Sequence, residues 1–121
     1  MKYPILFVVL SSLLVWSACS EDNDMPEEMD KECTEQYTFS GEVQALINAT
    51  CAYSGCHAGG LGLPDFRSYE GLVATIESGR FQNRVLQQMS MPPSNAQGPI
   101  SLTEEELHLL SCWIEQGYPE D

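Results

Sequence analysis

Two cysteines and a histidine carry the clearest chemistry in this sequence. Cys51 and Cys56 are separated by four residues, and His57 follows the second cysteine directly. This arrangement is close to C-x-x-C-H, in which two thiols bond to the vinyl carbons on one edge of a porphyrin and the histidine presents a nitrogen to the iron. The longer gap requires a looped backbone, which Ser54-Gly55 permits. These residues therefore predict covalent attachment of one haem c.

The same residues allow two other interpretations. In an oxidising compartment, Cys51 and Cys56 form a small disulfide loop. Together with His57 they also supply three ligands of a zinc site, although a structural zinc needs a fourth Cys or His. On either interpretation the chain is a haem-free, exported binding or structural module that disulfides stabilise.

A methionine further along the chain is the expected second axial ligand of the iron. Met91 stands before Pro92-Pro93, and its thioether suits iron in the haem sites of electron carriers. We rank Met89 second, because we expect it to continue a buried helix face, and His108 third, because we expect it on the last helix. A His–Met site indicates an electron carrier and not an enzyme. A peroxidase, the other haem protein considered, needs an open axial position.

Few cations are present to meet the two propionates of a haem. Within residues 37–121 these cations are Arg67, Arg80 and Arg84. Arg80 and Arg84 are four apart, so they share one face of a helix. A guanidinium binds a carboxylate through two hydrogen bonds, and we predict that Arg84, with Arg80 as second choice, contacts a propionate. The alternative is that both are surface charges paired with acids such as Glu77.

The first 18 residues predict an export signal. A lysine precedes 13 uncharged residues, 4–16, which is too short for a comfortable membrane span and typical of a signal peptide. Small residues before Cys19 resemble a bacterial lipobox, although Trp16 stands where leucine is usual. The resemblance implies lipidation of Cys19 and a membrane-anchored lipoprotein facing the periplasm or the cell surface. The alternative is ordinary cleavage near Ala18.

Acidic residues dominate the chain that remains after such cleavage. Residues 20–36 carry eight acids and few apolar side chains, so residues 19–36 are expected to form a lipidated acidic tether to a domain over residues 37–121. After cleavage, four basic residues against 18 acidic residues leave a net charge of −14. Nucleic-acid binding is therefore excluded, because no basic surface exists for phosphates. The charge predicts a redox partner that presents a basic patch.

Short helices joined by glycine- and proline-rich loops are expected after residue 36. Three serines are expected to cap helices, in the following ranges: 41–50 after Ser40, 69–76 after Ser68 and 79–88 after Ser78. The last helix has the clearest signals, because Thr103 and Glu106 form a capping box and Gly117 suits its end. No alternating strand pattern of useful length follows residue 36, so the predicted class is all-α.

The order of these features resembles a small class I cytochrome c domain. It is most similar to the haem domains of bacterial lipoproteins and to planctomycete-type cytochrome c modules. The resemblance covers about residues 39–118 and rests on the Cys51–His57 segment, Met91-Pro92-Pro93 and the capped helix that contains Trp113. It departs in its four-residue cysteine gap, which some multihaem cytochromes c share. It implies packing of the first helix on the last, with Trp113 near the haem.

The five cysteines can be divided on this basis. Cys19 is the lipid anchor, and Cys51 and Cys56 are the thioether positions. Cys33 and Cys112 remain, and they either pair as a disulfide or leave Cys112 as a buried free thiol. The sequence as a whole predicts a monohaem c-type electron-transfer lipoprotein.

Overall fold

The computed structural model describes residues 31–121. The predicted signal peptide 1–18, the predicted lipidation site Cys19 and most of the predicted acidic tether lie outside the described residues. The described part is helical and contains no strand, which confirms the predicted all-α class. None of its helices is both long enough and apolar enough to cross a membrane.

The first helical segment runs from Phe39 to Thr50. A π-helical turn, η2 (Phe39–Val43), continues into α1 (Gln44–Thr50). The predicted cap at Ser40 is wrong: the Thr38 hydroxyl accepts the hydrogen bond from the Gly41 amide, at 3.2 Å. The helix begins two residues earlier than predicted because Thr38 is extended and caps the turn, whereas Ser40 already lies inside it.

The middle of the chain forms α2 (Tyr69–Glu77) and a second π-helical segment, η3 (Gln82–Gln87). The predicted cap at Ser68 is confirmed, since its hydroxyl accepts a backbone N–H at 3.2 Å. The predicted cap at Ser78 is wrong. Ser78 closes the end of α2, where its hydroxyl donates to the Thr75 carbonyl at 2.8 Å.

The last helix, α3 (Glu104–Glu115), begins at the predicted capping box. The Thr103 hydroxyl accepts from the Glu106 amide at 3.2 Å, and the Glu106 carboxylate accepts from the Thr103 amide at 2.8 Å. Gly117 follows the helix with a φ of +85°, a left-handed conformation that glycine adopts without strain. Both signals of this helix are local in sequence, and both are confirmed.

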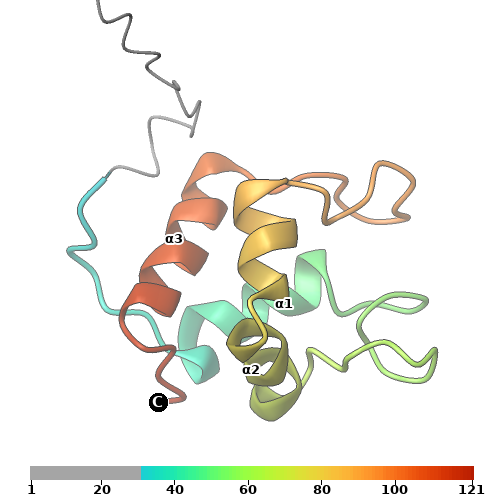
Figure 1. Ribbon diagram of the computed structural model, residues 1–121, viewed down its shortest axis with the longest axis horizontal. Helices are drawn as coiled ribbons and strands as arrows, with labels where there is room; N and C mark the ends of the chain where they lie inside the picture. Colours follow the sequence, from blue (N-terminus) through green and yellow to red (C-terminus); the bar gives the residue numbers. More distant parts are fainter. Residues whose placement is uncertain (1–30) are drawn as a thin grey trace, which may run out of the picture.

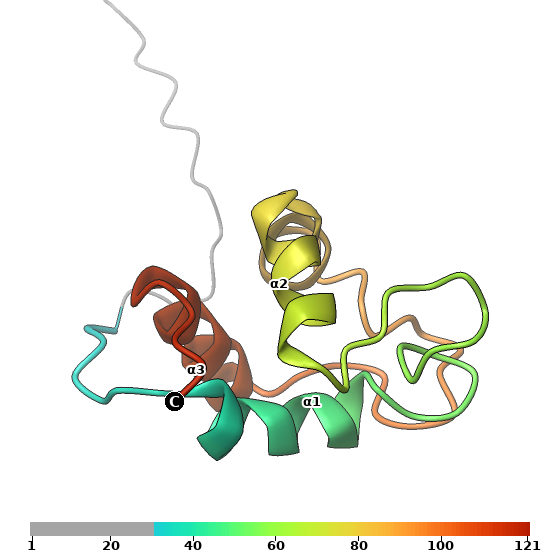
Figure 2. The same cartoon turned by 90° about the horizontal axis from the view of Figure 1, so that it is seen from below.

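Figures 1 and 2 show how the helices are arranged around one another. Apolar side chains from every helix of the described chain meet in one core. Its fully buried members include Val43, Ile47, Leu72, Leu110 and Trp113. The first and last helices pack together, as the resemblance implied, with the rings of Phe39 and Trp113 centred 6.4 Å apart.

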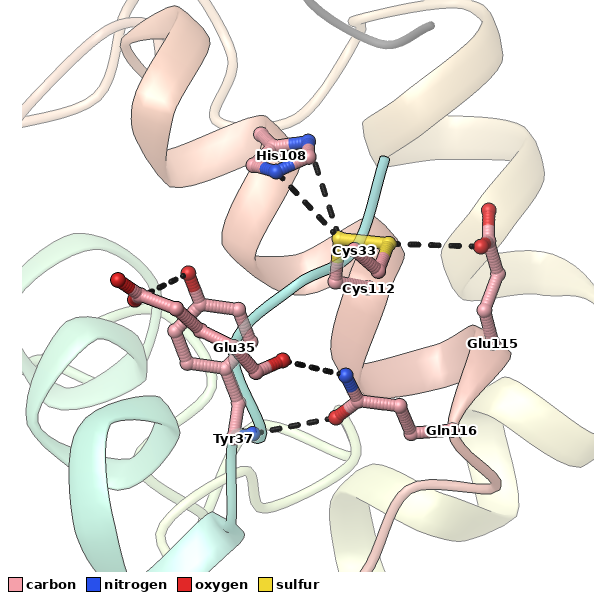
Figure 3. Close-up of a disulfide and its surroundings, with 7 residues drawn as sticks. All are labelled: Cys33, Glu35, Tyr37, His108, Cys112, Glu115 and Gln116. Carbon is pink, nitrogen blue, oxygen red and sulfur yellow. Dashed lines mark hydrogen bonds between the residues drawn. A yellow bond between two sulfur atoms is a disulfide. The ribbon is translucent and has the colours of Figure 1, made fainter. Parts of the chain in front are cut away.

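Residues 33–37, here called the strap, lie along α3 and are bonded to it (Figure 3). Cys33 and Cys112 form a disulfide, so the alternative of a free thiol at Cys112 is wrong. The Gln116 side chain accepts from the Tyr37 amide at 3.1 Å and donates to the Glu35 carbonyl at 2.6 Å. Residues 33–37 are therefore attached to the domain at three points.

Candidate functional site

A cavity of about 300 Å³ brings the predicted site residues together. All five residues predicted to bind the cofactor line it: Cys51, Cys56, His57, Arg84 and Met91. Its other walls are mostly apolar, and they include the following side chains: Leu63, Pro64, Phe66, Phe81, Val85, Pro92 and Pro93. A mostly apolar pocket with a few converging polar groups is the usual form of a cofactor site.

The two cysteines belong to the loop that follows α1. The loop closes on itself, because the Cys56 amide donates to the Tyr53 carbonyl at 3.0 Å and the His57 amide donates to the Cys51 carbonyl at 3.1 Å. Gly55 has a φ of +83°, which supports the turn expected at this position. The four-residue gap is thus absorbed by a compact turn that returns His57 to the vicinity of Cys51.

Both cysteines of this loop are free in the structure, so the alternative disulfide between Cys51 and Cys56 is not formed. Burial raises the pKa of the Cys51 thiol, although the Thr50 hydroxyl, 3.3 Å from the sulfur, partly offsets this effect. Residues 31–121 contain no group of three or more Cys, His, Asp or Glu that could hold a metal ion.

The His57 imidazole is held in one orientation by two neighbours. Its Nδ1 lies 3.0 Å from the Pro64 carbonyl oxygen, and its ring stacks on Phe66 with centroids 3.9 Å apart and planes within 5°. A carbonyl only accepts hydrogen bonds, so Nδ1 carries the proton. The lone pair of Nε2 then remains available to a metal, as in histidines whose second nitrogen is fixed by a carbonyl.

Of the three candidate axial ligands, Met91 alone lines the cavity. It is half-buried, and its amide donates to the Arg84 carbonyl at 3.2 Å. The expectation that Met89 is a core residue is wrong: the side chain is 46% exposed, because a left-handed backbone (φ +46°) follows η3 there. His108 lies beside the disulfide, with its imidazole nitrogens 3.5 and 3.8 Å from the Cys112 sulfur (Figure 3).

Two exposed arginines lie at the edge of the cavity. Arg80 and Arg84 both line it, as their shared helix face predicts. Neither forms an ion pair within the described chain, where Arg67 pairs with Asp65 at 2.6 Å. The alternative pairing with nearby acids is therefore not observed, and both guanidiniums remain available to an anionic group.

Three residues of the site were not singled out from the sequence. Pro64 and Phe66 hold His57, and Tyr53 contributes to the cavity wall. No motif marks them, because their roles depend on how two loops fold back. Trp113, which the resemblance implied to lie near the haem, is not among the residues that line the cavity. Its indole N–H donates to the Pro119 carbonyl at 3.0 Å, which holds it in the core and outside the cavity lining.

Comparison of the chain with protein-family models, with curated proteins and with solved structures finds no match.

Proposed function

We propose that this protein is a monohaem c-type electron carrier with a class I cytochrome c-like domain, exported and anchored to a membrane through Cys19. The observation that carries the proposal is the convergence on one apolar cavity of Cys51, Cys56, His57 and Met91. Two thiols, an imidazole and a thioether are the donor set of an electron-carrying haem c site. They come from two segments of the chain that are more than 30 residues apart.

The residues present fit this cofactor in chemistry as well as in position. Cys51 and Cys56 would hold it covalently, and His57 and Met91 would supply the two axial ligands. When bound, the haem supplies a one-electron couple between ferric and ferrous iron. Arg84 would meet a propionate at the edge of the cavity, where no acid of the described chain competes for it.

The protein's own groups tune such a site in three ways. The Pro64 carbonyl keeps the proton on Nδ1 of His57, which orients the ring and leaves Nε2 as a ligand. The apolar walls of the cavity would limit the access of water to the bound group. As a ligand, the Met91 thioether would favour the reduced iron and raise the reduction potential. With both His57 and Met91 holding the group, no ligand position would remain for peroxide, which favours a carrier over a peroxidase.

The partner we propose is a redox protein with a basic patch. Residues 37–121 hold ten acidic residues and three arginines, so the domain carries a charge of −7. Complementary charge increases the rate of encounter, and salt screens the effect. The association rate should therefore fall as ionic strength increases, whereas acidic residues that serve solubility alone would leave the rate flat.

The second candidate is a haem-free, disulfide-stabilised exported module, which the Cys33–Cys112 disulfide also favours. A potentiometric titration of the protein, produced together with haem-maturation machinery, separates the two. The proposed function predicts a single reversible one-electron transition and no turnover of peroxide. If the only redox transition observed is that of the disulfide, the result supports the second candidate.

A further inference from the structure

The loop that carries the two cysteines contacts a second loop, residues 94–101, through the side chain of Tyr53. The Tyr53 hydroxyl accepts a hydrogen bond from the Gly98 amide at 3.3 Å. Gly98 lies against the aromatic ring, where a Cβ atom would come within 2.9 Å of two ring carbons. A side chain at position 98 would therefore displace the Tyr53 ring from its present position. The two loops extend from the same end of the molecule (Figures 1 and 2).

The 94–101 loop directly follows Met91-Pro92-Pro93, which line the cavity. Most of its residues are exposed. Its one other hydrogen bond in the described structure joins the Ala96 amide to the Pro93 carbonyl, at 2.9 Å, within a single turn. Tyr53 is thus the side chain whose hydrogen bond joins this loop to the cysteine loop, and Tyr53 itself lines the cavity.

The position of Tyr53 depends on the length of the cysteine loop. Tyr53 stands at the start of the turn that the Cys56 amide closes, two residues after Cys51. The four-residue gap between the cysteines supplies this turn, and Tyr53 lines the cavity from it. Met91 lines the same cavity, and Pro92 and Pro93 connect it to the 94–101 loop.

We propose that Tyr53 is a positioning residue that clasps the cysteine loop to the 94–101 loop and thereby keeps the Met91 thioether in the cavity. The proposal rests on the proposed function for the ligand role of Met91, but the clasp is a property of the chain. Loss of the Tyr53 hydroxyl should free the loop and make departure of Met91 from the cavity easier. A hydrogen bond of ordinary strength corresponds to about a fivefold change in such an equilibrium.

The first test uses the haem-loaded full chain and imidazole, which binds the ferric iron only where Met91 leaves. Tyr53→Phe should tighten imidazole binding about fivefold, and Tyr53→Ala, which also removes the ring, should tighten it further. The matched control is Tyr69→Phe. The Tyr69 hydroxyl likewise forms one hydrogen bond, in which it donates to the Tyr118 carbonyl at 2.9 Å, but Tyr69 does not line the cavity. Equal imidazole affinity in Tyr53→Phe and Tyr69→Phe would overturn the proposal.

The second test does not need haem and separates failure of the clasp from failure of the proposed function. Dilute hydrogen peroxide converts a methionine thioether to its sulfoxide, with water as the other product. In the haem-free full chain, Tyr53→Phe should accelerate oxidation of half-buried Met91 relative to exposed Met89, and Tyr69→Phe should leave this ratio unchanged. An unchanged ratio in Tyr53→Phe would overturn the clasp. A raised ratio in a chain that never binds haem would support it while the proposed function fails.

Discussion

Removal of the Cys33–Cys112 disulfide should destabilise the domain strongly. The bond joins residues separated by 79 positions and ties the strap to α3. Closing a loop of that length lowers the entropy of the unfolded chain by an amount worth about 4.5 kcal/mol at 25 °C. Native disulfides of small secreted domains typically contribute between about 2 and 5 kcal/mol, so we expect a loss in the upper part of that range.

The perturbation is the double variant Cys33→Ala/Cys112→Ala, measured by urea unfolding at 25 °C and monitored by the fluorescence of Trp113. Small domains have a free energy of unfolding of about 5–15 kcal/mol, so the variant should remain folded but marginal. Each single variant should lose nearly as much as the double variant, because either change opens the loop.

Two further comparisons make this prediction refutable. The unmodified protein treated with a thiol reductant should match the double variant, whereas the double variant should not respond to the reductant. If the free energy of unfolding falls by less than about 1 kcal/mol, the disulfide does not restrict the unfolded chain as its loop length predicts, and the reasoning is wrong.

Three other predictions concern the site and its supports. Met91→Ala should abolish the weak red absorption band that arises between the thioether and ferric iron, because it removes a ligand, whereas Met89→Ala should leave this band in place. The opposite result in absorption spectra would make Met89 the ligand. Arg84→Gln should lower the reduction potential, because loss of a nearby positive charge favours ferric iron; an unchanged potential in electrochemical titration would make Arg84 a surface charge. Thr103→Ala should reduce the free energy of unfolding by about 1 kcal/mol in chemical denaturation, because it removes the cap of α3, and an effect near zero would contradict the capping box.

Features encoded by neighbouring residues could be predicted from the sequence. The capping box at Thr103 and the glycine after α3 are local, and both were predicted correctly. The cap of the first helix was predicted wrongly at Ser40: Thr38 caps the turn, and Phe39 between them is buried in the core. Met89 shows the same limit: helical periodicity predicted burial, but the backbone turns left-handed after η3 and exposes it.

The candidate site likewise contains residues that could be predicted from the sequence and residues that could not. Residue chemistry predicted the groups that line the cavity, because thiols, imidazole and thioether are uncommon and their order in the chain is informative. The residues that position them could not be predicted, since Tyr53 and Gly98 are 45 positions apart and meet only after both loops fold. The contact of His57 with Pro64 likewise depends on the path of the glycine-rich loop.

The central claim is tested most directly by the intact mass of the full chain after production with haem-maturation machinery. The account predicts a red protein whose mass, under denaturing conditions, exceeds that of the chain by one haem, and loss of this increment in Cys51→Ser/Cys56→Ser. A colourless protein with the mass of the chain alone and a disulfide between Cys51 and Cys56 would contradict it.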